Sequence, residues 1–145
     1  MNINKFPAVI LAILLLESCI GGPKDSPKLN QYMVEGMQLY RTHCTNCHQV
    51  DGTGLARLIP PLNGSDYLKN MVSGDLACQI RYGLRGEIMV NDIGFNQEMP
   101  GIPNLTPLEI AEIITYVNNT WGDKDGLFEV KAAEKALNDC NQADL

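Results

Sequence analysis

The segment Cys44-Thr45-Asn46-Cys47-His48 carries the residues whose types and spacing are most able to do chemistry. Two cysteines separated by two residues and followed directly by histidine form the pattern of covalent haem attachment. Each thiol can add to one vinyl group of the porphyrin, and the histidine that follows can bind the iron. The pattern predicts that Cys44 and Cys47 anchor one haem c covalently and that His48 is an axial ligand of its iron.

Two other uses of paired cysteines compete with this interpretation. A thioredoxin-like redox pair is expected in a βαβ setting, and the flanks of this motif are not strand-like. A zinc site normally needs four protein ligands. The remaining cysteines, Cys19, Cys78 and Cys140, form no second pair of this spacing, and His43 is too close to the motif to complete a separate half-site. Haem attachment is therefore the favoured interpretation.

Length and charge restrict the class of protein. The chain has 145 residues, 45% of them hydrophobic, which fits one globular domain plus an export segment. Its formal net charge is -6, which argues against a nucleic-acid partner. An acidic surface is compatible with docking onto a basic patch of a redox partner protein.

The N-terminus is typical of an export signal. Phe6 to Leu16 is apolar apart from Pro7, too short to span a bilayer comfortably, and predicts a signal peptide over residues 1–18. The following Leu16-Glu17-Ser18-Cys19 resembles a bacterial lipobox, from which Glu17 departs. We expect a lipid on Cys19 to anchor an exported lipoprotein to a membrane, facing the periplasm or the cell surface. The alternative is an ordinary cleavable signal with an incidental cysteine.

A flexible tether is expected over residues 19–30, which are rich in glycine, proline and polar residues. The next segment, Gln31 to His43, has the apolar spacing of an amphipathic helix. This helix would run directly into the haem motif. Gly36 in its middle costs about 1 kcal/mol relative to alanine, so it is either a tolerated defect or a point where another helix crosses closely. The apolar positions are Met33, Val34, Met37 and Tyr40.

Shorter elements are predicted between the motif and residue 100. Ser65 is placed to cap a short helix through Met71, and Ser73 to cap a second helix that stops at Gly83. Ile88 to Phe95 indicates a small turn or hairpin.

Two further helices are predicted after residue 105. Thr106 and Glu109 form a capping box, with Pro107 at the first helical position, and this helix ends at Trp121-Gly122. Apolar spacing within residues 123–145 predicts another helix in a C-terminal extension.

The order of these features resembles a class I cytochrome c domain, small and with one haem. The resemblance covers roughly residues 31–122: helix, CxxCH, a loop with glycines, a late Met-Pro and a last helix ending in Trp-Gly. It implies an all-α fold of several helices around the haem. In that family Gly36 and Tyr40 resemble the positions where the first helix crosses the last. A proline carbonyl accepts the hydrogen bond from the axial imidazole, for which Pro60 fits best and Pro61 is the alternative.

The residues alone leave more than one candidate for the sixth ligand of the iron. Met33 and Met37 belong to the first helix's apolar stripe, Met71 lies at a helix end, and His43 is held near the proximal side. Met89 and Met99 remain as candidates. The resemblance implies Met99, which precedes Pro100 at the family's distance before the last helix. Histidine and thioether ligands would leave no open position on the iron, which suits an electron carrier and not an enzyme.

Two cysteines remain after these assignments. An even pair in an oxidising compartment suggests a disulfide, so we expect Cys78 and Cys140 to clip the C-terminal extension to the domain. The alternative is two free buried thiols.

The sequence thus predicts a membrane-tethered one-electron carrier in a respiratory electron-transfer chain, with redox proteins as partners. Three alternatives stay open. A haem enzyme or gas sensor would need a labile sixth ligand, a cytochrome subunit would belong to a larger reductase or oxidase complex, and a thiol oxidoreductase would use Cys44 and Cys47.

Overall fold

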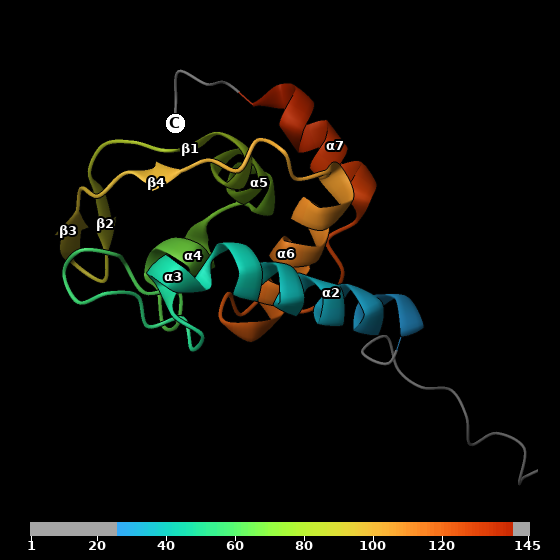
Figure 1. Cartoon of the computed structure of the whole chain (residues 1–145), viewed down its shortest axis with the longest axis horizontal. Helices are drawn as coiled ribbons and strands as arrows, with labels where there is room; N and C mark the ends of the chain where they lie inside the picture. The colour runs from blue at the N-terminus through green and yellow to red at the C-terminus, as the bar shows by residue number, and fades with distance from the viewer. Residues whose placement is uncertain (1–25, 141–145) are drawn as a thin grey trace, which may run out of the picture.

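A computed structural model describes residues 26–140, so the expected signal peptide and Cys19 lie outside the described part of the chain. The structure is mostly helical with short strands (Figure 1), which agrees with the expected fold class. The helices are α2 (Pro27–His43), α3 (Thr45–His48), α4 (Asp66–Asn70), α5 (Ser73–Tyr82), α6 (Pro107–Thr120) and α7 (Val130–Asp139), and the strands are β1 (Gly83–Leu84), β2 (Ile88–Val90), β3 (Ile93–Phe95) and β4 (Met99–Pro100).

The first helix, α2, begins four residues earlier than predicted. Ser26 caps it by accepting a hydrogen bond from the backbone N–H of Leu29 at 3.2 Å, and Pro27 occupies the first turn. Leu29 and Tyr32 are buried. Residues 27–30, which were assigned to the flexible tether, are therefore helical because they have both a cap and an apolar contact face.

Helix α6 is the centre of the fold, and residues 110–118 are buried apart from the half-buried Tyr116. Its start is as predicted, since Thr106 and Glu109 form both hydrogen bonds of a capping box. Ile113 and Val117 face a large cavity, whereas Ala111 packs with Tyr32 and Ala133 on another side. A helix that buries mostly apolar residues on several sides is expected in the interior of a domain.

Gly36 is the point where α2 crosses α6. A Cβ atom added there would lie 2.1 Å from the backbone oxygen of Glu112 and 2.9 Å from the Cβ of Tyr116. The mid-helix glycine is thus required by a close helix crossing and is not a tolerated defect. Tyr40, one turn further along, is 1% exposed and packs its ring 5.1 Å from that of Trp121. The predicted crossing of the first and last family helices at Gly36 and Tyr40 is confirmed.

Helices α4 and α5 differ in how they start. Ser65 caps α4 as predicted, through a hydrogen bond from the backbone N–H of Leu68. The prediction that Ser73 caps α5 is wrong, because Val72 is the N-cap and Ser73 is already helical. The Ser73 hydroxyl instead accepts a hydrogen bond from the Asn118 side chain at 2.9 Å, which links α5 to α6.

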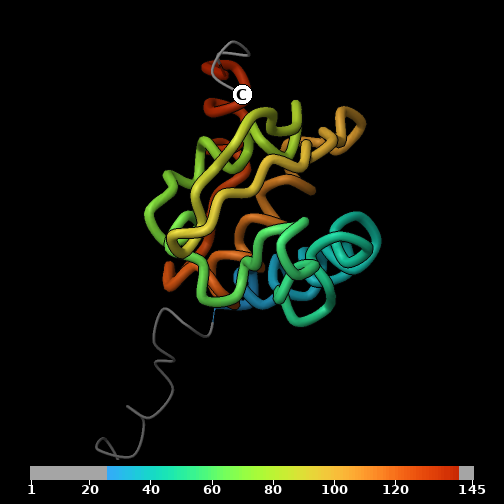
Figure 2. The backbone as a smooth tube through the Cα atoms, turned by 90° about the vertical axis from the view of Figure 1, so that its left-hand side faces the viewer, coloured from blue at the N-terminus to red at the C-terminus, as the bar shows by residue number. Residues whose placement is uncertain are grey.

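Two short antiparallel ladders lie beside the helices. Strands β2 and β3 form the predicted hairpin, whose two turn residues, Asn91 and Asp92, both have positive φ. Strand β1 pairs with β4, placing Leu84 opposite Met99. Figure 2 shows these segments running side by side across one face of the molecule.

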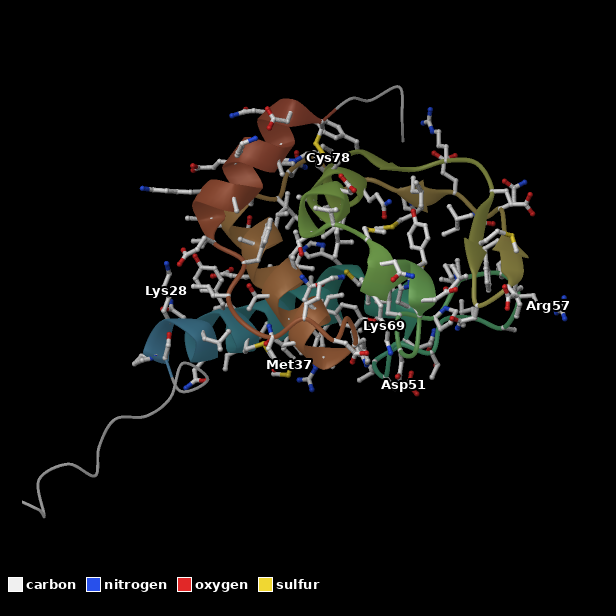
Figure 3. All side chains as sticks on the ribbon, turned by 180° about the vertical axis from the view of Figure 1, so that it is seen from behind. Lys28, Met37, Asp51, Arg57, Lys69 and Cys78 are labelled. Atoms are coloured by element: carbon white, nitrogen blue, oxygen red, sulfur yellow. A yellow bond between two sulfur atoms is a disulfide. The ribbon has the colours of Figure 1, made fainter. Side chains whose placement is uncertain are left out.

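Helix α7 packs against α5 and α6. Cys140, which directly follows α7, forms a disulfide with Cys78 on α5, with a Cα–Cα distance of 5.8 Å, and Figure 3 shows Cys78 beside α7. An ion pair between Lys28 and Glu129 joins the starts of α2 and α7. Within residues 26–140, no helix is both long enough and apolar enough to cross a membrane.

Candidate functional site

A largely apolar cavity brings most of the predicted site residues together. It is bounded by the haem motif, the loop that follows it, α4, α5, the β-ladders and α6. Residues that line it include Cys44, Cys47, His48, Ile59, Pro60, Leu62, Leu68, Ile80, Leu84, Val90, Phe95, Met99, Ile113 and Val117. Such a cavity, apolar with a few polar groups, is suited to a large flat organic cofactor.

The haem motif is held at the end of α2. The backbone N–H of Cys44 donates to the Tyr40 carbonyl at 2.8 Å, and Thr45–His48 form the short helix α3. The chain turns sharply at Gln49, whose φ is 63°. The buried hydroxyl of Tyr40 donates to the Gln49 carbonyl at 2.7 Å. The α2–α6 crossing therefore fixes the motif through Tyr40.

His48 is half-buried, and its Nδ1 is a buried atom without a well-formed hydrogen bond among the described residues. Burial lowers the pKa of His48, and the carbonyl of Pro60 lies close enough to oppose this effect. The imidazole is thus neutral at neutral pH, the form that binds metals. Of the two candidate prolines, Pro60 is the one whose carbonyl influences the pKa of His48.

Gly54 allows the loop to bring Pro60 to this position. Its φ is +69°, and a Cβ atom there would lie 2.4 Å from the Ile59 carbonyl oxygen and 2.7 Å from that of Pro60. Its backbone N–H donates to the His48 carbonyl at 3.1 Å. A glycine is therefore needed where the two sides of the loop meet.

The two motif cysteines are not joined to each other. Cys44 is half-buried and Cys47 is exposed, and both are free thiols. Burial, and then the neighbouring Cys47, raise the pKa of Cys44 to about 12. Reactive redox thiols have a lowered pKa, so this environment does not favour a thiol oxidoreductase.

The two candidate methionines lie in different surroundings. Met99 lines the cavity together with His48, as does Met71 from the end of α4. Met89 is 57% exposed and does not line the cavity; it borders the adjoining groove, which shares Tyr67, Met71 and Gln79 with the cavity wall. His43 also reaches the cavity wall, from the end of α2.

Sequence reasoning missed two polar residues of the cavity wall. Gln79 on α5 is buried, and its Nε2 donates to the hydroxyl of Tyr67 on α4 at 2.9 Å. Both side chains line the cavity. The sequence held a signal for Gln79, because it falls on the helix face that carries Leu76 and Ile80. A polar residue on an otherwise apolar helix face indicates a specific role for its side chain.

The donor set of the cavity fits haem c. It supplies two unbridged thiols, a neutral imidazole and a thioether, all within one apolar lining. Nδ1 is the buried ring nitrogen of His48, which leaves Nε2 as the nitrogen that could bind iron. No cluster of three or more His, Cys, Asp or Glu side chains suited to a metal ion occurs within residues 26–140.

Comparison with known proteins agrees with this geometry. The sequence model of the cytochrome c family matches residues 33–121. Cytochrome c-552 of Thermus thermophilus is 30% identical over 94 residues, which cover 61% of this chain and 70% of that protein.

A second group of relatives consists of larger proteins. The cytochrome c subunit of alcohol dehydrogenase (quinone) from Gluconobacter oxydans is 31% identical over 90 residues. The corresponding subunit from Komagataeibacter europaeus is 30% identical over 97 residues. These matches cover 61% and 66% of this chain but only 18% and 20% of the two subunits.

The matched region includes the CxxCH motif, the glycine loop, Met99 and α6. The resemblance expected from the sequence is therefore confirmed. Proteins of this kind are electron carriers with covalently attached haem c, one per domain of this size. The chain belongs to the class I cytochrome c family.

Proposed function

We propose that this protein is a membrane-tethered one-electron carrier of a respiratory electron-transfer chain, with His48 and Met99 as the axial ligands of its haem iron. The observation that carries the proposal is the shared cavity of His48, Met99 and the two motif cysteines. Met89, the rival ligand, borders a different groove and is mostly exposed. The exposure of Met89 favours Met99 as the second ligand of the iron.

Haem c supplies a reversible couple between ferric and ferrous iron. Cys44 and Cys47 would hold it covalently, and His48 would bind the iron as a neutral imidazole whose ring Pro60 would help to orient. The soft thioether of Met99 would favour the ferrous state and would occupy the remaining position on the iron. With both positions filled by side chains there is no site for a substrate, so the protein exchanges electrons without making or breaking bonds in a substrate.

Paired variants at the two methionines test the axial assignment. Met99→Ala should open the sixth position, so that the ferric protein loses its methionine–iron charge-transfer band and the ferrous protein binds carbon monoxide rapidly. Met89→Ala is the control and should leave both properties unchanged. An unaltered spectrum in Met99→Ala, with loss of the band in Met89→Ala, would reverse the assignment.

The membrane tether rests on the lipobox at Cys19, which lies outside the described residues. The acidic net charge of -6 supports docking onto basic redox partners. Mass spectrometry of the exported protein should find lipid on Cys19, one haem, and the Cys78–Cys140 bridge. A Cys19→Ser variant should leave the membrane fraction, and retention of that variant would disprove the lipid anchor.

A second candidate function is suggested by the dehydrogenase relatives. Their printed name describes a cytochrome c subunit of a quinone-linked alcohol dehydrogenase. This chain would then accept electrons from a dehydrogenase within a stable complex. Size-exclusion chromatography of the native membrane extract distinguishes the two candidate functions. A carrier elutes alone, whereas a subunit elutes with its enzyme.

A further inference from the structure

The chain that follows Met99 forms part of the cavity wall and then leads into α6. Met99, Gly101 and Ile102 line the cavity. Strand β4 is only two residues long, and residues 101–106 after it form neither helix nor strand. We call residues 99–106 the methionine loop. A segment of this kind has few backbone hydrogen bonds of its own, so its position depends on contacts with other elements.

The end of α5 supports the first half of the methionine loop. The backbone N–H of Ile102 donates to the Ile80 carbonyl at 2.8 Å. Gly101 lies so close to α5 that an added Cβ atom would be 2.7 Å from the Arg81 carbonyl oxygen. The β1–β4 ladder fixes the two residues before it. Backbone contacts therefore hold the loop as far as Ile102.

The second half of the loop is held by the side chain of Arg81, in the last turn of α5. Its Nη1 donates to the Pro103 carbonyl and its Nη2 to the Leu105 carbonyl, both at 2.6 Å. Its Nε is buried and has no hydrogen-bond partner among residues 26–140. Within the same residues, Arg81 forms no ion pair with a carboxylate. The guanidinium thus uses its planar fork to bind two carbonyls of one loop.

A second arginine lies near Met99 but is bound differently. The Nε of Arg85 donates to Glu98, which directly precedes Met99, at 2.9 Å. The side chains of Arg85 and Glu98 are 79% and 55% exposed, and an ion pair this exposed contributes little to stability. The hydrogen bond from Arg81 to Leu105 is partly buried, and a charged donor makes it stronger than a bond between neutral groups. Of the two arginines, Arg81 is therefore the one expected to hold the loop.

We propose that Arg81 is a positioning residue, which holds the methionine loop against the cavity and so keeps Met99 available to the haem iron. The proposal rests on the proposed function of Met99 as an axial ligand. Arg81 is not among the described residues that line the cavity, so it acts through the loop and not on the haem. In the open state of the loop Met99 leaves the iron, and the hydrogen bonds of Arg81 keep this state rare.

Binding of carbon monoxide to the ferrous, haem-loaded protein measures how often the loop opens, because the gas can bind only where Met99 has left the iron. Arg81→Met removes both hydrogen bonds and keeps an unbranched side chain. Two net hydrogen bonds of ordinary strength change the open population about thirtyfold, and the binding rate at low gas concentration should rise by the same factor. Arg85→Met removes an equal charge from the exposed ion pair and should leave the rate unchanged.

Arg81→Lys separates positioning from charge. The variant keeps the positive charge, but an ammonium group cannot reproduce the fork that spans the two carbonyls. Its rate of carbon monoxide binding should lie between those of the wild type and Arg81→Met. A wild-type rate in Arg81→Lys would overturn the positioning role. If Arg81→Met does not fold, Arg81→Lys is compared with Arg85→Lys, and only the former should bind the gas faster.

Hydrogen exchange shows where the protein opens. The amide of Ile102 should lose protection in Arg81→Met by the factor by which gas binding accelerates. Tyr32→Leu controls for a general loss of stability, because Tyr32 is buried with Ala111 and Ala133 and does not line the cavity. This variant should change neither the Ile102 amide nor gas binding.

Two results would overturn the proposal. One is unchanged Ile102 protection and gas binding in both Arg81 variants. The other is an equal effect of Tyr32→Leu, which would show that the loop opens only when the whole protein unfolds. If Met99→Ala leaves the spectrum unaltered, the axial assignment fails instead, whereas exchange of the Ile102 amide still tests whether Arg81 holds the loop.

Discussion

Replacing Gly36 by alanine is expected to destabilise the protein, although alanine is the better helix former. The added Cβ would lie 2.1 Å from the Glu112 carbonyl oxygen and 2.6 Å from its carbonyl carbon. Ordinary contacts begin near 3.4 Å, so the two helices would have to separate by about 1 Å. These atoms belong to the backbone of a buried helix, and they cannot move aside as a flexible side chain could.

The size of the effect follows from two opposing contributions. Alanine gains about 1 kcal/mol over glycine in helix propensity. Overpacking typically costs about 1–3 kcal/mol, and a backbone contact belongs at the upper end of this range. The net loss in the free energy of unfolding is about 2 kcal/mol, which for a domain of this size lowers Tm by about 8 °C.

Gly74 provides the matched control, since it also lies within a helix, α5. A Cβ atom there would meet only the Cβ of Ala136 at 3.4 Å. Gly74→Ala should therefore keep or increase stability, by at most about 1 kcal/mol. Urea unfolding of both haem-loaded variants, followed by far-ultraviolet circular dichroism, measures the difference. Equal stability of Gly36→Ala and Gly74→Ala would refute the argument that the crossing requires glycine.

Three further predictions concern the bridge, an N-cap and the haem anchors. Replacing both Cys78 and Cys140 by serine should lower the free energy of unfolding by about 4 kcal/mol on the chain-entropy model, given their sequence separation of 62; an unchanged urea midpoint would contradict this. Hydrogen bonds from Thr106 lower the pKa of Glu109 below 4.5, so its contribution is present above that pH and lost as the pH falls through the folded pKa; Glu109→Gln should flatten this part of the stability curve. Cys47→Ala should leave one vinyl group unsaturated and move the pyridine haemochrome band to longer wavelength, and an unmoved band would remove Cys47 as an anchor.

The features that sequence predicted well are those encoded by neighbouring residues. The capping box of Thr106 and Glu109 depends on two side chains three positions apart, and the structure contains it as expected. The hairpin also lies within Ile88 to Phe95, the segment predicted as a turn or hairpin, and it turns at Asn91 and Asp92. In each case the contacts that determine the structure join residues only a few positions apart in the sequence.

Features that depend on distant contacts were missed. Strands β1 and β4 are two residues each, too short for any alternating pattern, and fourteen residues separate them in the chain. Ser73 has the residue type of an N-cap but serves as a hydrogen-bond acceptor for Asn118, 45 residues away. The role of Gln79 likewise depends on Tyr67, which lies on another helix.

The start of α2 was misplaced for a different reason. Ser26-Pro27 is a recognisable helix start, but the surrounding glycine and proline residues indicated a tether. Leu29 and Tyr32 complete the helix by packing inward. Tyr32 meets Ala133 of the C-terminal extension, so part of the reason for this helical turn lies a hundred residues further along the chain.

Helix α6 uses different sides for its different neighbours. Ile113 and Val117 face the cavity, whereas Ala111 and Thr115 face the segment that leads into α7. Helix α7 of the C-terminal extension consequently lies at one edge of the molecule, packed on α5 and α6 and away from β2 and β3 (Figure 1). Coupling the protein to an electrode through a residue of α7 would leave the opposite side, with the cavity, directed toward the solution, where soluble redox proteins could reach it.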